Sequence, residues 1–407
     1  MHTGNVVRQL GPTCGLRAKN EQKKGMEQSM PLSGVKVIEV GLNLAGPLAG
    51  EILAGLGAEV IKVERPEGGD DARGWGPPFV HGASMSFHSM NRNKRSVTVD
   101  FKDPAALERL QCLIAESDIF IQNLRPGVAE EIGLGPTALL ELNPRLIYCS
   151  IAAFGHQGPL RLKPGYEILL QAFAGLMSMT GEENGPPLRM GTSVVDFGTG
   201  MSTAIAALAA LRQRDRTGRG CVIETSLFET ALFWLCNTFA QYTVSGKVPE
   251  RHPTGSPRQV AFGAFETKNG PLIIGVANDR LFAKLARALN RPEWVEDPRF
   301  RTNADCLTHR DYLLGEIRTI LRQETKEQWM DRLEAAGVPC APILTLPEVL
   351  AQPQTDALGI FHSVPETDGK MLSLPLSFDG VRAALSKRAP QLGEHNGEIF
   401  RDDETDP

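Results

Sequence analysis

The feature that most constrains the fold of this chain is a regular alternation of short β-branched runs with helical stretches, which starts at Pro31. Helical segments separate the strand candidates. The clearest one begins at Asp103-Pro104, with Asp at the cap and Pro in the first turn. The strand candidates are Val35–Val40, Glu59–Glu64, Ser96–Asp100, Asp118–Asn123, Leu146–Ser150 and Cys221–Thr225. Because strands spaced by helices require right-handed crossovers, the pattern predicts an α/β fold: a large Rossmann-like domain with a mostly parallel sheet.

A second kind of organisation follows the segment Lys247–Arg258, whose Pro, Gly and charge content indicates a linker. Two strand candidates surround an Asn269-Gly270 turn, as is typical of a hairpin, and helices follow. The strands are Ala261–Phe265 and Leu272–Val276, and the helices are Asp279–Leu289, Arg310–Arg322 and one with a capping box from Thr325 to Gln328. We predict a smaller inserted α+β domain at residues 247–337, with 31–246 and 338–407 forming the large domain.

Composition excludes several classes of partner. A net charge of −5 gives no reason to expect nucleic acid, so any anion site must be local. The 7 cysteines form no C-x-x-C pair, which favours a reducing compartment, and the 8 histidines form no metal-binding pair, so no metal site is predicted. No apolar stretch has both the length and the lack of polar residues that a membrane span requires.

The first thirty residues differ from the rest, because they carry several cations and no acid before Glu21. This composition indicates either a disordered extension at residues 1–30 or an organelle-targeting peptide. We expect a cytoplasmic protein, or one of the mitochondrial matrix if the segment is a targeting peptide.

One carboxylate, Asp196, follows an apolar run and enters the Gly-x-Gly sequence at Gly198 and Gly200, which indicates a turn ahead of an Ala-rich helix over Phe197–Gln213. Such a carboxylate has few solvating neighbours and several small backbone groups after it. These surroundings suit a nucleophile better than a surface charge. The alternative is that Asp196 is a simple helix N-cap.

Small and basic residues follow the ends of several predicted strands, where open α/β sheets bind ligands. Ala45-Gly46-Pro47 follows the first strand, and Arg65, Lys94, Arg95 and Lys102 supply positive charge. A nucleotide with several phosphates fits this pattern, and the alternative is that these are ordinary solvated charges. Neither the dinucleotide fingerprint nor the P-loop motif occurs.

Taken together, the motifs resemble those of the family III CoA-transferases. They are V-x-x-x-x-A-G-P, G-A-E-V-I-K-V-E-R-P, G-D-D-A-R-G-W-G-P-P-F, N-R-N-K-R-S, A-F-G-x-x-G-P and L-G-E-H, and they cover roughly Pro31 to Phe400. The resemblance implies an interlocked homodimer, in which each chain forms a ring that the other threads. It also implies acyl-CoA and carboxylic acid substrates, no permanently bound cofactor, and an aspartate that forms acyl-anhydride and aspartyl-CoA thioester intermediates.

The resemblance also implies roles for individual residues. Asp196 matches the nucleophile, and backbone N–H groups near Gly198 and Gly200 would stabilise oxyanions by about 3 kcal/mol per donor. Glu167 and Gln171 lie four residues apart, and they either orient the anhydride or hydrogen-bond a neighbouring loop. The positions that match CoA contacts are Leu44, Ala45, Arg65, Val99, Asp100, Phe101, Lys102, Asn123 and Leu124.

The chain departs from formyl-CoA transferase at two places. An arginine that contacts CoA in that enzyme is Glu131 here, and the glycine-rich loop that closes over its active site is missing between Arg258 and Phe265. Oxalate is therefore not the substrate that we expect.

The nearest competing function is that of a 2-methylacyl-CoA racemase, which shares the fold and abstracts an α-proton with a His/Asp pair. Racemases resemble this chain but carry Gly-His-Asp where it has Gly165-Tyr166-Glu167. Tyr166, with an ordinary pKa of about 10, is a poor base near neutrality, which favours the transferase. We interpret His156 as a loop residue near the substrate. A second alternative is a non-catalytic protein that binds CoA thioesters.

Two features bear on the choice of acid. Thr254-Gly255-Ser256-Pro257 is similar to a loop of transferases that use dicarboxylates, and Arg189 is placed to clamp a distal carboxylate. The sequence thus favours succinyl-CoA as the donor and a small di- or hydroxy-carboxylic acid as the acceptor. A solvated loop charge is the alternative for Arg189.

Overall fold

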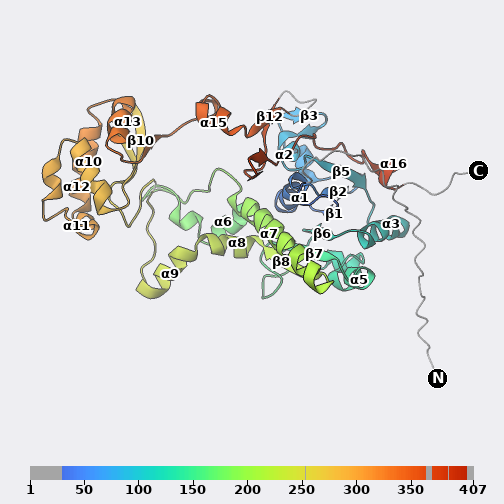
Figure 1. Ribbon diagram of the computed structural model, residues 1–407. Coiled ribbons are helices and arrows are strands. Elements are labelled where there is room, and N and C mark those ends of the chain that lie inside the picture. The colour runs from blue at the N-terminus through green and yellow to red at the C-terminus, as the bar shows by residue number, and fades with distance from the viewer. Residues whose placement is uncertain (1–29, 253, 364–368, 384, 401–407) are drawn as a thin grey trace, which may run out of the picture. The chain divides into compact units, whose positions relative to one another are not determined.

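The computed structural model describes residues 30–252, 254–363, 369–383 and 385–400, which form two compact units (Figure 1). The first unit holds the described residues up to Leu170, Ser193–Trp234 and those from Ile360 onward. The second holds Gln171–Thr192 and Leu235–Gly359. The predicted N-terminal extension lies outside the described residues except for Met30.

The first unit is built on a six-stranded sheet in the order β5-β2-β1-β6-β7-β8, and every pairing in it is parallel. Its strands are β1 (Lys36–Val40), β2 (Glu59–Glu64), β5 (Lys94–Thr98), β6 (Ile119–Gln122), β7 (Ile147–Ala152) and β8 (Cys221–Ser226). The α/β class with a parallel sheet is therefore confirmed. The third predicted strand begins two residues earlier than expected, because Lys94 already pairs with Val60 of β2.

The strand order contains a topological switch between β1 and β6. From β1 the chain adds β2 and then β5 on one side, and afterwards it adds β6, β7 and β8 on the other side. In an open α/β sheet such a switch leaves a crevice beyond the carboxyl ends of the two central strands. The residues just after Val40 and Gln122 are consequently the expected place for a ligand.

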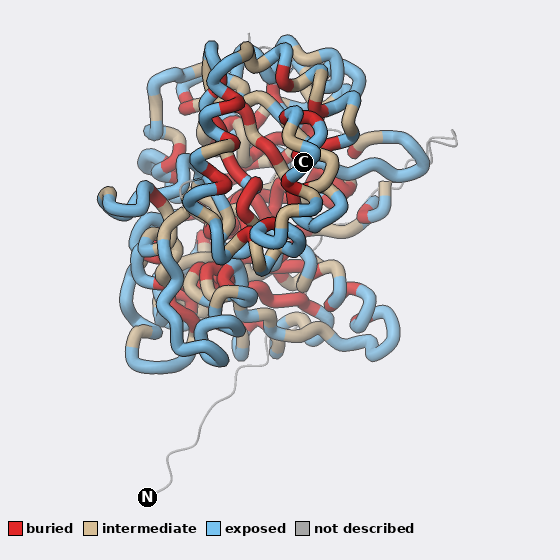
Figure 2. The backbone as a smooth tube through the Cα atoms, turned by 90° about the vertical axis from the view of Figure 1, so that its left-hand side faces the viewer, coloured by how far each residue is buried: buried red, intermediate tan, exposed pale blue. Residues whose placement is uncertain are grey.

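The helices of the first unit cover both faces of this sheet. They are α1 (Ala45–Gly55), α2 (Met85–His88), α3 (Pro104–Ala115), α4 (Val128–Glu131), α5 (Pro136–Leu142), α7 (Val194–Thr217), α8 (Leu227–Trp234) and α16 (Asn396–Ile399), and α6 (Glu167–Phe173) continues into the second unit. The sheet is apolar towards α3, where Ile38 and Ile61 share a core with Leu110. Side chains alternate between the two faces along a strand, so Glu39 and Lys62 point to the opposite face, against α1. In Figure 2 the buried stretches of the backbone are red and the exposed ones pale blue.

Helix α7 is the longest in the described part of the chain, and it packs against α1. In contrast to the expectation from the sequence, it alone among those residues has the length and apolar composition of a membrane span, although half of that stretch is buried inside the protein. Such burial is what the core helix of a folded domain shows. The helix begins at Val194, so the turn predicted at Gly198 and Gly200 is wrong: both glycines are helical.

The second unit contains a three-stranded antiparallel sheet in the order β11-β10-β9 with helices around it. Its elements are β9 (Phe262–Thr267), β10 (Gly270–Gly275), β11 (Cys340–Pro342), α9 (Cys236–Ser245), α10 (Asp279–Ala288), α11 (Asn303–Thr308), α12 (Arg310–Leu321), α13 (Lys326–Ala335), α14 (Leu346–Leu350) and α15 (Pro353–Leu358). The hairpin at Asn269-Gly270 and the capping box of Thr325 with Gln328 are confirmed. The structure differs from the expected return to the large domain at residue 338, because Ile274 pairs with Cys340 and so keeps that segment in the small sheet.

Candidate active site

Asp196 lies in the first turn of α7, three residues after the N-cap Ser193, and is half-buried. The first backbone N–H groups of a helix have no acceptor within the helix, and the helix dipole favours negative charge at this end. An anionic nucleophile is therefore electrostatically favoured at this position. The N-cap alternative does not hold for Asp196 itself, because Ser193 occupies the cap.

Gly198 and Gly200 let α7 approach its neighbours closely. A Cβ on Gly198 would lie 2.6 Å from the Trp234 ring, and one on Gly200 would lie 2.7 Å from the carbonyl oxygen of Ala45. The helical hydrogen bonds of α7 begin with the Phe197 N–H, which donates to the Ser193 carbonyl. The N–H groups of Gly198 and Gly200 therefore point to carbonyls one helical turn earlier. The two glycines thus allow close helix packing, whereas the family resemblance implies that the N–H groups near them stabilise an oxyanion.

This packing brings the start of α7 beside the turn after β1. Gly200 follows Asp196 by four residues, so the two lie on the same face of α7. Gly200, which abuts the carbonyl oxygen of Ala45, follows Asp196 by about one helical turn of α7. The structure therefore packs the helix that carries the predicted nucleophile against the segment that carries two predicted CoA contacts.

Glu167 holds the N-terminus of α7. Its side chain is buried, and Oε1 accepts a hydrogen bond from the backbone N–H of Val195 at 3.4 Å, next to Asp196. One turn further along α6, the buried Gln171 accepts a hydrogen bond from the backbone N–H of Met190 at 3.0 Å within the second unit. Bonding to a neighbouring segment was one of the two alternatives predicted for this pair, and orientation of the anhydride stays a prediction.

The turn between β1 and α1 is clamped from β6. Asn123 accepts a hydrogen bond from the Leu42 N–H and donates one to the Leu42 carbonyl, both at 2.8 Å. The side-chain amide of Asn123 is thus committed to Leu42, and this bond spans the switch between β1 and β6.

The other predicted CoA contacts also lie beyond the carboxyl ends of strands. Arg65 follows β2 and is exposed, with an ion pair to Asp71. After β5, Val99 is buried in the core, whereas Asp100 and Lys102 are exposed and Phe101 is half-buried. They line one edge of the sheet together with Leu44 and Leu124, as the strand order requires.

Two of the predicted cations, Lys94 and Arg95, form ion pairs within the protein instead of facing a ligand at this edge. Lys94 is buried and bonded to Glu39 at 2.7 Å, and Arg95 pairs with Glu59 and Glu398, each at 2.7 Å. The expectation that they supply charge to a ligand is wrong, because Lys94 is the first residue of a strand instead of part of a loop.

A cavity of about 280 Å³ opens beyond the ends of β6, β7 and β8. Leu124, Arg125, Arg161 and His156 are among its lining residues, so it places two guanidinium groups beside a predicted CoA contact. His156 Nδ1 lies 3.7 Å from a carboxylate oxygen of Glu224. Sequence reasoning missed Arg125 and Arg161, although the position of Arg125 two residues after a strand-end asparagine was a usable signal.

Tyr166 is exposed at the start of α6, and Arg189 is exposed in the second unit. The role of Arg189 as a carboxylate clamp stays a prediction. Within the described ranges, no group of three or more His, Cys, Asp or Glu side chains is arranged to hold a metal ion.

Comparison with known proteins gives a consistent result. The model of the family described as CoA-transferase family III matches residues 32–396. The chain is 36% identical to the succinyl-CoA:glutarate CoA-transferase of Mus musculus over 91% of this chain and 86% of that protein. It is 37% identical to the succinate–glutarate CoA-transferase of Agrobacterium fabrum, over 92% and 96%. A CAIB/BAIF family protein from Brucella suis has a similar crystal structure, with a TM-score of 0.81, 38% identity, and coverage of 92% of this chain and 99% of that one.

Proposed function

The chain belongs to CoA-transferase family III and is an enzyme that moves CoA from an acyl-CoA to a carboxylic acid; from this premise we propose that Asp196 is the nucleophile that carries the reaction. The observation that supports this proposal most directly is the close packing of α7 on α1 at Gly200. It joins the helix whose first turn carries this half-buried carboxylate to the segment that carries Leu44 and Ala45.

The first half of the reaction forms two covalent intermediates on Asp196. The carboxylate attacks the carbonyl carbon of the thioester, the C–S bond breaks, and an acyl-aspartyl anhydride and CoA thiolate result. The thiolate then attacks the aspartyl carbonyl, releases the donor acid as its carboxylate, and leaves an aspartyl-CoA thioester.

The second half repeats these steps in reverse with the acceptor. Its carboxylate attacks the aspartyl carbonyl and expels CoA thiolate, which then attacks the new acyl carbonyl. The product is the new acyl-CoA, and the Asp196 carboxylate is restored. Because one thioester replaces another, the exchange is close to balanced in free energy as long as water is kept from the intermediates.

CoA itself is proposed to lie along the carboxyl edge of the sheet. The exposed Arg65 and Lys102 supply cations beside β2 and β5, and Arg125 and Arg161 line the cavity beyond β6 and β7. Guanidinium groups bind phosphates by paired hydrogen bonds, so these residues suit the phosphates of CoA. Leu44 and Ala45, between the two regions, would contact the thioester end.

We propose succinyl-CoA as the donor and a small dicarboxylic acid as the acceptor. The support is that the relatives in Mus musculus and Agrobacterium fabrum are named for succinyl or succinate and glutarate. Arg189 is the residue proposed to bind the distal carboxylate. Assay of a panel of mono-, di- and hydroxy-carboxylic acids with succinyl-CoA tests this, and turnover with monocarboxylates alone would contradict it.

A homodimer is proposed as the working assembly. A single chain leaves many large apolar side chains exposed along α6, α7 and α8, among them Ile168, Leu169, Ile205, Phe233 and Trp234. Exposed apolar side chains of this size and number are typical of a protein interface. Light scattering coupled to size exclusion, at concentrations down to the assay range, tests the assembly directly.

The nucleophile is tested by trapping. Enzyme mixed with acyl-CoA is treated with hydroxylamine or borohydride, and peptide mass mapping should place the modification on Asp196. Asp196→Asn should abolish transfer and keep CoA binding, whereas Asp215→Asn, an exposed aspartate near the other end of α7, should leave turnover unchanged. An unmodified Asp196 peptide during turnover would exclude this mechanism.

A further inference from the structure

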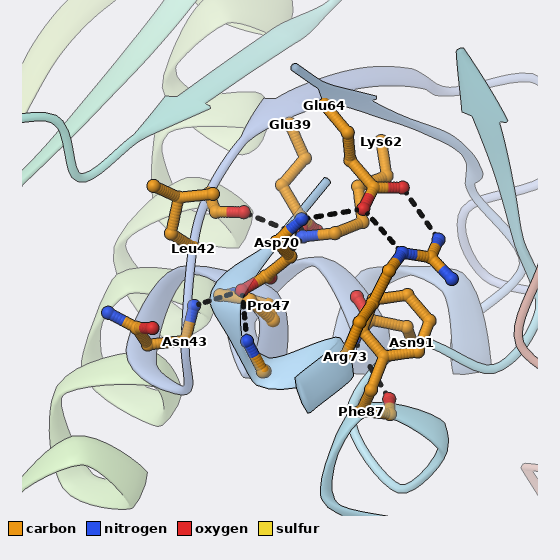
Figure 3. A network of polar contacts seen from close by, with 12 residues as sticks. Glu39, Leu42, Asn43, Pro47, Lys62, Glu64, Asp70, Arg73, Phe87 and Asn91 are labelled. Carbon is orange, nitrogen blue, oxygen red and sulfur yellow. Dashed lines mark hydrogen bonds and ion pairs between the residues drawn. The ribbon is translucent and has the colours of Figure 1, made fainter. Parts of the chain in front are cut away.

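A buried charge network lies between the sheet and α1, and the proposed mechanism does not use it (Figure 3). It consists of Glu39 on β1, Lys62 on β2, Lys94 on β5 and Asp70, and their side chains are buried. Glu39 joins the two lysines, with one carboxylate oxygen 3.1 Å from Lys62 Nζ and the other 2.7 Å from Lys94 Nζ.

Each lysine also donates to one backbone carbonyl of the Gly41–Pro47 segment, which comprises the turn after β1 and the first residues of α1. Lys62 Nζ donates to the Gly41 carbonyl at 2.6 Å, and Lys94 Nζ donates to the Pro47 carbonyl at 2.8 Å. The third partner of Lys62 is Asp70 at 2.9 Å, and that of Lys94 is Asn91 at 2.9 Å. An ammonium group has three protons, and Lys94 uses all three in hydrogen bonds, whereas Lys62 donates two and adds an ion pair with Asp70. Each lysine ties the sheet to one end of the Gly41–Pro47 segment.

The middle of the turn adopts a backbone conformation that few residues other than glycine take up. Asn43 has φ of +66°, in the left-handed region that side chains rarely adopt, although Asn tolerates it better than most residues. Its backbone N–H donates to Asp70 Oδ1 at 3.0 Å, and Figure 3 shows this bond at the edge of the network. Leu44 and Ala45 follow directly, so the network fixes both ends and the centre of the segment that carries them.

Stability alone does not explain such an arrangement. Removing several charges from water is costly, and well-packed apolar residues in their place would usually stabilise a fold as much or more. Burial lowers the pKa of Lys94, whereas the carboxylates of Asp70, Glu39 and Glu64 outweigh burial at Lys62 and raise its pKa. A rigid turn with defined carbonyl positions is something that apolar residues could not provide.

We propose that Lys62 and Lys94 are positioning residues that hold the Gly41–Pro47 turn in the conformation that receives CoA. The inference rests on the proposed function, which assigns CoA contact to Leu44 and Ala45. The lysines act through the backbone of the turn and touch neither CoA nor the acceptor acid. Their loss should therefore weaken CoA binding before it affects the chemical step.

The test compares Lys62→Met and Lys94→Met with Arg214→Met. Arg214 is also a buried cation in an ion pair, 2.9 Å from Asp118, but it lies at the opposite, amino-terminal edge of the sheet. All variants are made in full-length protein and checked for cooperative melting. If Lys94→Met does not fold, Glu39→Gln/Lys94→Met removes the orphaned carboxylate together with the lysine.

Two measurements are made on each variant. Calorimetric titration with free CoA should show a loss of affinity of about ten-fold or more for the lysine variants, since a turn that must order on binding lowers the affinity. In the absence of CoA, hydrogen exchange in peptides covering residues 41–50 should be faster in the lysine variants than in the parent. The KM for acyl-CoA should rise while the KM for the acceptor acid does not, and Arg214→Met should show none of these changes.

Folded lysine variants with the CoA affinity and exchange rates of the parent would overturn the proposal. A parent protein that binds no CoA would instead refute the proposed function. In that case, exchange in residues 41–50 still decides whether the lysines order the turn, because that measurement uses no ligand.

Discussion

Gly200 of α7 packs directly against the carbonyl oxygen of Ala45, with room for a hydrogen and none for a methyl group. A Cβ at this position would lie 2.7 Å from that oxygen and 3.0 Å from the Leu48 side chain. The contact joins the helix that begins with the proposed nucleophile to the turn proposed to hold CoA. One close approach of two backbones therefore joins both parts of the proposed active site.

Gly200→Ala should separate these two parts. Overpacking against backbone costs about 1–3 kcal/mol of stability, which exceeds the gain of about 1 kcal/mol that Ala brings to a helix. We expect a lower melting temperature and a loss of kcat/KM of at least about ten-fold, measured by thermal unfolding and steady-state assay. Gly315→Ala is the matched control, since nothing lies within 4 Å of a Cβ there in α12. It should keep activity and stabilise the protein slightly, and equal effects of the two variants would contradict the packing argument.

Glu167→Ala should lower kcat more than Glu167→Gln. The alanine variant leaves the Val195 N–H at the start of α7 without its acceptor, at a cost of about 1–3 kcal/mol, whereas Gln keeps a carbonyl oxygen there. Single-turnover assays at saturating acyl-CoA would measure the chemical step directly. If both variants turn over at the parental rate, the hydrogen bond to Val195 does not position Asp196.

The ligand-binding edge of the sheet could be predicted from the sequence, because strand periodicity and strand-end residues are local signals. Leu44 and Leu124, which only the family resemblance singled out, lie at that edge. The Gly-x-Gly sequence was misleading, because glycine signals a turn equally well when it serves close helix packing. The burial of Lys94 could not be predicted from the sequence, because its partner Glu39 lies 55 residues away and no local pattern links the two.

Arg125→Gln should raise the KM for acyl-CoA by roughly ten-fold, because a cation that binds phosphate contributes about 1–3 kcal/mol. The effect should weaken as ionic strength rises, since an exposed guanidinium is screened by salt. Initial rates at two salt concentrations measure both points. Arg212→Gln, an exposed arginine on α7, is the control and should leave KM unchanged. An unchanged KM for acyl-CoA in Arg125→Gln would show that this cavity is not part of the CoA site.

Glu51, buried on α1 beside Arg92, should make the stability of the fold depend on pH. Burial raises its pKa from 4.5 to about 7, against the opposing pull of Arg92 and Lys94. Below pH 4.5 the carboxyl is protonated in both the folded and the unfolded chain. Between pH 4.5 and 7 the folded chain holds a proton that the unfolded chain has lost, so this contribution to stability falls as pH rises. A shift of this size is worth up to about 3 kcal/mol.

Glu51→Gln should therefore flatten the decline in unfolding free energy between pH 4.5 and 7, because Gln has no proton to lose but still accepts the hydrogen bond that Arg92 Nε donates to Glu51 at 3.0 Å. Urea titrations at half-unit pH steps give the slope directly. Glu108→Gln, at an exposed position on α3, controls for the loss of one carboxylate elsewhere on the unit. Parallel curves for Glu51→Gln and the parent would show that Glu51 ionises in the folded protein as readily as in the unfolded chain. The pair with Arg92 would then be an ordinary ion pair whose attraction offsets the cost of burial.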